Sequence, residues 1–363
     1  MSVVVIHLVL LPLTVLIGLR VWRGQVVPEL LEAASGVAFF GCAVLMFAAL
    51  TLDVGPLFFG LLQLLAWLLF LYAPALLVLG ALRAPGTPRT VGLPLALALV
   101  LVGVDAVLIE PFALQTRRAT IEVPGLVEPL RVALVADIQT HHVGAHERAA
   151  LQVVAEAEPD LLLFAGDYIQ VDDSAELAAE RAALAEAIRT IVPPLRLGAH
   201  AVEGDVDRPG WPEAFAGTDV SSATEPIVSR ELGAIDLVLL DLDTSRAPLT
   251  ALPPGRSEAS LTIVLGHRPD FSLGLEDAGP NILMLAGHTH GGQVQLPGVG
   301  PLITFSQVDR ARAHGRSILA GGASLVVSAG VGLERSTAPR LRFFCPPEVW
   351  ILDVVPASGE RGD

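Results

Sequence analysis

Long apolar stretches fill the first 110 residues and restrict what this part of the chain can form. They cover residues 3–19, 33–52, 57–82 and 91–109. Each is long enough to cross about 30 Å of hydrocarbon as a helix. A cleavable signal peptide would explain only the first stretch, which has no basic segment before it and no small-residue cleavage site after it. The sequence therefore predicts a membrane region of about four transmembrane helices in residues 1–110.

Arginines in the short connecting loops orient these helices. Those after the first and third stretches are Arg20, Arg23, Arg83 and Arg89. Under the positive-inside rule these two loops face the cytoplasm, and an even number of spans puts the C-terminal part outside. Arg117 and Arg118, after the fourth stretch, oppose this orientation by two charges against four. We expect a multi-pass protein of the bacterial inner membrane whose C-terminal domain is extracytoplasmic.

After residue 110 the pattern changes to short apolar strands that alternate with amphipathic helices. We expect a linker over 111–129, a folded domain over 130–355 and a disordered tail over 356–363. Helices are predicted at 146–157 and 174–191. Strands are predicted at 131–136, 160–165, 199–202, 235–240, 261–265, 282–285, 325–328 and 349–354. This alternation is typical of an α/β domain, in which ligands bind beyond the carboxyl ends of the strands.

The charge of the soluble part excludes one class of partner. From Ile121 onward, 33 aspartates and glutamates stand against 17 arginines, which leaves sixteen net negative charges. Such a surface repels nucleic acid, so no nucleic-acid partner is expected.

Carboxylate and imidazole side chains follow five of the predicted strands at the point where each strand ends. They are Asp137, Asp167, Asp205, His267, and the pair His288 and His290. One such residue would mean little, since Asp is common in turns and at helix starts. In AGHTHGGQ, an extended backbone would point His288 and His290 to the same side. The series predicts a metal cluster at these strand ends, because divalent ions take carboxylate and imidazole ligands.

The order and spacing of these motifs resemble those of the calcineurin-like metallophosphoesterase superfamily over about residues 130–353. The segments GHTHGGQVQLP and PRLRFFCPPEVWIL are most similar to the YkuE-type branch of membrane-associated bacterial phosphoesterases. The resemblance implies a four-layer α-β-β-α sandwich and two divalent metal ions (Mn, Fe, Zn or Mg).

When the family's metal ligands are carried over to the matching motifs of this sequence, the resemblance implies two ligand sets that share Asp167. The first set is Asp137, Gln139, Asp167 and His290, and the second is Asp167, Asp205, His267 and His288. It also implies catalytic roles for Asp167 and His288. His142 is a further candidate, since His141 and His142 closely follow the first strand end and offer an imidazole in place of the missing one.

The sequence departs from the family pattern at three positions. Gln139 stands where the family has a histidine and offers an amide oxygen instead of a nitrogen. Asp205 replaces an asparagine and adds a negative charge. Val206 replaces a histidine that assists the leaving group or contacts the phosphate.

Two functions fit this altered site. The first is a membrane-anchored, metal-dependent phosphoric ester hydrolase acting on phosphomonoesters or phosphodiesters, with lipid-linked or envelope phosphates as candidate substrates. The alternative is a metal-binding interaction or regulatory module with a degenerate catalytic site. The oligomeric state is not predicted by the sequence.

Overall fold

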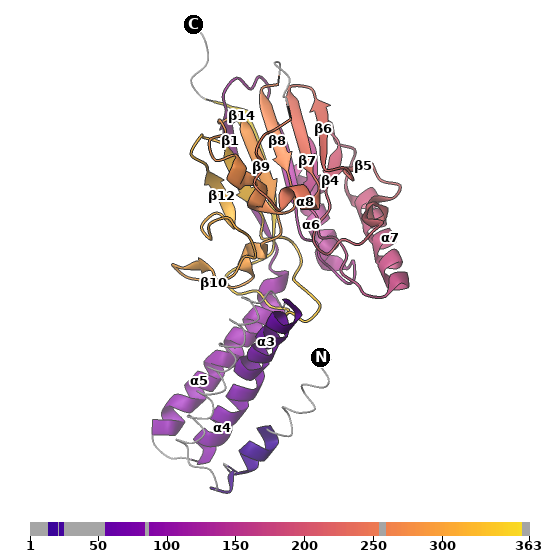
Figure 1. Ribbon diagram of the computed structural model, residues 1–363. Coiled ribbons are helices and arrows are strands. Elements are labelled where there is room, and N and C mark those ends of the chain that lie inside the picture. The colour runs from indigo at the N-terminus through magenta and orange to yellow at the C-terminus, as the bar shows by residue number, and fades with distance from the viewer. Residues whose placement is uncertain (1–13, 21, 25–54, 84–86, 254–258, 358–363) are drawn as a thin grey trace. The chain divides into compact units, whose positions relative to one another are not determined.

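The computed structural model describes residues 14–20, 22–24, 55–83, 87–253 and 259–357. The chain divides into two compact units (Figure 1). A helical unit comprises Met1–Ile109 with Glu334–Arg340, and an α/β unit comprises Glu110–Leu333 with Leu341–Asp363.

Two long apolar helices make up most of the described part of the helical unit. The first joins α3 (Gly55–Trp67), the π-helical turn η1 (Leu68–Tyr72) and α4 (Ala73–Arg83), and the second joins α5 (Thr87–Val104) and η2 (Asp105–Ile109). With mean hydropathies of 2.2 and 2.4, they are long and apolar enough to cross a membrane. They match the third and fourth predicted spans. The first two predicted spans lie outside the described residues, apart from a helical segment at 14–20, so the number four stays a prediction.

Small residues let these two helices pack closely. A Cβ atom added at Gly103 of α5 would lie 2.9 Å from the Cβ of Phe70, and one added at Gly92 would lie 3.4 Å from the Cβ of Ala81. Such small-residue contacts are the usual way in which helices approach each other in a bilayer.

The α/β unit contains two six-stranded mixed sheets and a small two-stranded ribbon. The first sheet has the order β1-β14-β2-β3-β4-β5 and the second β12-β13-β9-β8-β7-β6. Strands of the first sheet are β1 (Gln115–Val123), β2 (Leu130–Val135), β3 (Leu161–Phe164), β4 (Ala199–Ala201), β5 (Val220–Ser222) and β14 (Glu348–Pro356). Strands of the second are β6 (Ile227–Leu232), β7 (Ile235–Leu240), β8 (Leu261–Leu265), β9 (Ile282–Ala286), β12 (Gly315–Ile318) and β13 (Ser324–Val327). The ribbon pairs β10 (Gln295–Leu296) with β11 (Gly300–Pro301).

The two sheets pack face to face around a shared core. Alternate side chains of β2 point to opposite faces, so Val132 and Leu134 join this core while Ala133 and Val135 pack on the outer side. Leu237 and Ile263 reach the same core from the second sheet. The central strands, such as β2, β3, β7 and β8, read as nearly continuous apolar runs because both faces of each sheet are covered.

Helices cover the outer face of the first sheet more fully than that of the second. On the first lie α6 (Ala145–Ala157) and α7 (Ser174–Ile191), together with the 3₁₀ turn η4 (Trp211–Phe215). On the second, the covering elements include the one-turn helix α8 (Leu242–Ser245), the 3₁₀ helix η5 (Pro269–Gly274) and loop residues (Figure 1). The predicted four-layer sandwich is thus present as two packed mixed sheets, with a reduced helical layer on the second.

Several elements have the bounds expected from the sequence, and one region differs. Helix α7 and strands β7 and β8 coincide with the predicted segments. Residues 111–129, expected to be a linker, contain strand β1, which pairs in parallel with β14 from Gln115↔Glu348 to Val123↔Pro356. This strand was missed because charged residues interrupt its apolar pattern, as suits the edge of a sheet.

Candidate metal centre

The predicted ligands lie where adjacent strands end. Asp137 follows β2, Asp167 follows β3 and Asp205 follows β4, while His267 follows β8 and His288 follows β9. The strands β2, β3 and β4 are parallel neighbours in one sheet, and β8 and β9 are parallel neighbours in the other. Their carboxyl ends therefore deliver these side chains to the same edge of the packed sheets.

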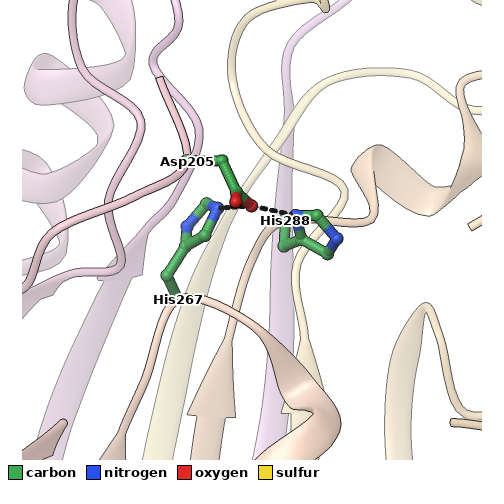
Figure 2. A group of neighbouring side chains, drawn as sticks. All are labelled: Asp205, His267 and His288. Carbon is green, nitrogen blue, oxygen red and sulfur yellow. Dashed lines mark ion pairs between the residues drawn. The ribbon is translucent and has the colours of Figure 1, made fainter. Parts of the chain in front are cut away.

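Asp205, His267 and His288 form one group, with a ligand atom from each within 4.8 Å of the others. Figure 2 shows the carboxylate of Asp205 between the two imidazole rings. Its Oδ2 lies 2.8 Å from Nδ1 of His288 and 3.2 Å from Nε2 of His267.

In each of the two rings, one nitrogen is bound to a backbone carbonyl oxygen and the other faces Asp205. Nδ1 of His267 lies 2.7 Å from the carbonyl oxygen of Ala165, which can only accept, so Nδ1 carries a proton and Nε2 is the nitrogen that faces the group. By the same argument, Nε2–H of His288 donates to the carbonyl oxygen of Phe305 at 3.0 Å, so the lone pair of Nδ1 points to Asp205. Within the described part of the chain, Nε2 of His267 has no hydrogen-bond partner.

A second group contains Asp137, Asp167 and His267, also with ligand atoms within 4.8 Å. Oδ2 of Asp167 lies 3.4 Å from Nε2 of His267, and the backbone N–H of Val206 donates to its other oxygen at 2.8 Å. The carboxylate of Asp137 accepts from the backbone N–H of His288 at 2.9 Å. Both carboxylates are thus held by backbone donors, and Asp167 leaves one oxygen directed into the site.

Burial gives these groups unusual proton affinities. It raises the pKa of Asp137 to about 7 and the pKa of Asp167 well above its ordinary value. Burial lowers the pKa of His267, but the carboxylates of Asp167, Asp205 and Asp137 outweigh it and raise that pKa to about 10. The cluster therefore retains protons in the absence of another cation, and a metal ion would take their place.

Backbone strain is concentrated at the same residues. Left-handed φ angles occur at Asp137 (46°), Asp167 (58°) and His288 (71°), where a non-glycine residue is disfavoured. A Cβ atom added at Gly330 would lie 2.6 Å from the Cβ of Asp137, so glycine is required for this close approach. Strained backbone and close packing of this kind are typical of functional sites.

The backbone at His290 differs from the extended form that the sequence analysis assumed. The backbone is not extended here, because Thr289 is right-handed helical and His290 begins the 3₁₀ turn η6 (His290–Gly292) with a φ of 47°. The reason given for a shared direction of His288 and His290 is therefore wrong. His290 is nevertheless buried, and within the described residues neither of its ring nitrogens has a hydrogen-bond partner. Such an imidazole fits a metal ligand set.

Gln139 and His142 are held by other side chains. Gln139 is buried, and its Nε2 donates to Oε1 of Gln170 at 3.1 Å, which fixes the orientation of the amide. His142 is exposed, and its Nδ1 lies 3.0 Å from Oε1 of Glu180 on α7. The structure thus gives His142 a partner on the helix rather than a place in either ligand group.

Three further residues organise the site and were not assigned such roles from the sequence. Arg246 and Arg268 both donate to the carboxylate of Asp205, Arg246 at 2.8 Å and Arg268 at 2.9 Å. Arg342 is fully buried and donates to the carbonyl oxygens of Ala329 and Gly332, beside the loop that contacts Asp137. Arg268 was visible in the sequence as the neighbour of His267, whereas Arg246 carries no motif signal.

The sequence is similar to proteins that are named metallophosphoesterase or phosphodiesterase. No family model matches the sequence. The chain is 32% identical over 216 residues to the phosphodiesterase YaeI of Escherichia coli (strain K12), a match covering 57% of this chain and 74% of that protein. It is 25% identical over 264 residues to the uncharacterized metallophosphoesterase YkuE of Bacillus subtilis (strain 168), covering 67% and 86%. It is also 25% identical over 253 residues to the uncharacterized metallophosphoesterase Cj0846 of Campylobacter jejuni, covering 66% and 63%.

Among solved structures, the phosphopantetheinyl hydrolase (PptH) from Mycobacterium tuberculosis aligns with 64% of this chain and 98% of its own. The identity is 12% and the TM-score 0.32, a likeness too weak to define function.

Proposed function

The chain belongs to the calcineurin-like metallophosphoesterase superfamily, and from this premise we propose that it is a membrane-anchored phosphoesterase that requires two divalent metal ions. One observation carries the proposal. Oδ2 of Asp205 lies 2.8 Å from Nδ1 of His288 and 3.2 Å from Nε2 of His267, so these three atoms need a shared proton or a metal ion between them. A divalent ion suits this donor set of carboxylate and imidazole.

Two ligand sets would hold the ions. Asp205, His267 and His288 would hold one ion, and Asp137 and Asp167 would contribute to the other with Gln139 and His290. Bound divalent ions polarise a phosphoryl oxygen and generate a nucleophile from water at neutral pH. Asp167 would serve both ions: one of its oxygens accepts from the N–H of Val206, and the other lies 3.4 Å from Nε2 of His267, which belongs to both ligand groups.

The side chain at 206 limits the chemistry. A valine holds no proton at this position, so the chain itself supplies no acid there for a poor leaving group. The missing acid favours phosphoesters whose leaving group departs easily. The same absence of an acid at position 206 favours the competing function, a metal-binding interaction module.

Exposed apolar side chains at Phe305 and in the segment before it support an amphiphilic substrate. The carbonyl of Phe305 accepts from His288, and the side chain of Phe305 is 45% exposed. Exposed Leu296, Val299 and Leu302 lie on or next to the β10–β11 ribbon, which precedes Phe305. We therefore propose a phosphoester that carries a lipid chain. Two apolar helices in the same polypeptide support a site of action at a bilayer.

The enzyme proposal is tested with the full chain purified in detergent, using a chromogenic phosphodiester with and without Mn²⁺. We expect Mn²⁺-dependent hydrolysis that is lost in Asp167→Ala and kept in Asp172→Ala, which removes an exposed partner of Arg208. Bound metal with no turnover of any phosphoester would instead support the interaction module.

The lipid proposal is tested by comparing a phospholipid dispersed in the same micelles with the soluble diester. Val299→Ser combined with Leu302→Ser should reduce turnover of the lipid substrate more than turnover of the soluble one. An equal reduction of both would contradict a lipid-contacting role for these residues.

A further inference from the structure

The carboxylate of Asp205 is contacted by cations on one side and by imidazoles on the other. Oδ1 accepts from Nη2 of Arg246 at 2.8 Å and from Nη2 of Arg268 at 2.9 Å. Oδ2 faces Nδ1 of His288 and Nε2 of His267, and it also accepts from Nε of Arg268 at 2.9 Å. The two arginines therefore fix the plane of the carboxylate and leave the remaining lone pair of Oδ2 on the imidazole side.

The fold places these two arginines together. Arg246 caps the C-terminus of α8, and its other guanidinium nitrogen contacts Asp243 at 3.1 Å. The backbone N–H of Arg268 donates to the hydroxyl of Ser245, the last residue of α8, at 3.3 Å. The side chains of Arg246 and Arg268 are 44% and 24% exposed, so they lie at the rim of the ligand cluster.

The negative charge of Asp205 is compensated by Arg246 and Arg268. An aspartate in place of the asparagine expected from the family pattern adds a third carboxylate beside Asp137 and Asp167. A carboxylate removed from water is costly unless it is paired and hydrogen-bonded. Two guanidinium groups supply that pairing, and the fork of Arg268 does so through two parallel hydrogen bonds.

We propose that Arg246 and Arg268 are positioning residues that hold the carboxylate of Asp205 and direct its Oδ2 to the metal position between His267 and His288. This inference rests on the proposed metal centre. Groups that orient metal ligands in this way typically change metal affinity by about 10- to 100-fold when they are removed. Asparagine at 205 would have no charge to compensate, and its single oxygen could not face the arginines and the imidazoles at the same time.

The test is titration calorimetry of the full chain in detergent with Mn²⁺. Arg246→Gln and Arg268→Gln are each expected to weaken Mn²⁺ binding about tenfold or more at one site. Arg268→Lys keeps the charge but loses the fork, so it should give a smaller loss. In an Asp205→Asn background the same arginine changes should have little further effect. Arg148→Gln is the matched control, because it removes an exposed pair with Glu186 between α6 and α7.

The outcomes separate this inference from the proposed function. A wild-type chain that binds no Mn²⁺ would refute the metal centre itself. Wild-type binding with Arg246→Gln and Arg268→Gln within twofold of it would overturn the positioning role alone. Equal losses in Arg148→Gln, or additive losses in the Asp205→Asn background, would also overturn it. If a glutamine variant fails to fold, Arg268→Lys still decides, since a loss larger than that of Arg148→Gln is required.

Discussion

Replacing Asp137 by asparagine should have opposite effects on the metal-free and the metal-loaded protein. Burial raises the pKa of Asp137 from 3.8 to about 7, so the folded metal-free chain pays to ionise this group. Below pH 3.8 the carboxyl is protonated in both the folded and the unfolded state, and no penalty exists. The penalty grows as the pH rises towards 7 and is complete above it.

The change in the free energy of unfolding follows from the difference between the folded and unfolded pKa of Asp137. A pKa difference of about three corresponds to about 4 kcal/mol of lost stability above pH 7. Asparagine removes that cost but weakens one of the hydrogen bonds from the N–H of His288, worth about 1 to 2 kcal/mol. The net gain for metal-free Asp137→Asn at pH 8 is therefore about 2 to 3 kcal/mol, or about 5 to 10 °C in melting temperature.

The assay is thermal unfolding of the full chain in detergent, in EDTA and in Mn²⁺, at pH 4.5 and pH 8. We expect Asp137→Asn to melt above wild type in EDTA at pH 8, to lose most of that advantage at pH 4.5, and to gain less from Mn²⁺. A lower melting temperature in EDTA at pH 8 would refute the reasoning.

Asp160→Asn provides a control of opposite sign. Burial alone would raise the pKa of Asp160, but hydrogen bonds from Arg196 and the N–H of Arg131 hold it below its ordinary value. Stability from such a group is present above its unfolded pKa and lost as the pH falls. The variant should therefore melt lower at pH 8, with or without Mn²⁺.

Four further results are expected. Elemental analysis of metal-loaded protein should approach two divalent ions per chain, and binding should weaken below pH 7, where protons compete for the ligands. Gln139→His with Val206→His should raise hydrolysis of simple phosphomonoesters about a hundredfold or more if the natural site is a weakened one; lower activity on a phosphodiester would mark it as specialised. A reporter active only outside the cytoplasm, fused after Asp363, should be active, and activity from a cytoplasmic reporter alone would refute the topology. Gly204→Ala should abolish Mn²⁺ binding because its Cβ would overlap Asp167, and unchanged binding would contradict the tight packing of this loop.

The strand ends were predictable because each is a local feature. An apolar run that ends at Asp or His, in four of the five cases directly after a glycine, reads the same in any α/β domain. The sequence alone therefore singled out Asp137, Asp167, Asp205, His267 and His288. Helix α7 was also predictable: Asp173 caps it through hydrogen bonds to the N–H groups of Ala175 and Glu176, which is again a local signal.

Only the tertiary structure decided which of these groups meet. The distance between strand ends depends on strand order, and the order places β14 between β1 and β2, which no local pattern states. The direction of the His290 side chain depends on the 3₁₀ turn η6, whereas the prediction assumed an extended backbone between His288 and His290. The sequence also does not predict the partner of Arg246, because a long cationic side chain in a loop can reach any nearby carboxylate. In the folded chain, α8 packs against the loop of Arg268, and Arg246 therefore binds Asp205. The chemical identity of the ligands is therefore a property of the sequence, while their distances, lone-pair directions and charge balance are properties of the fold.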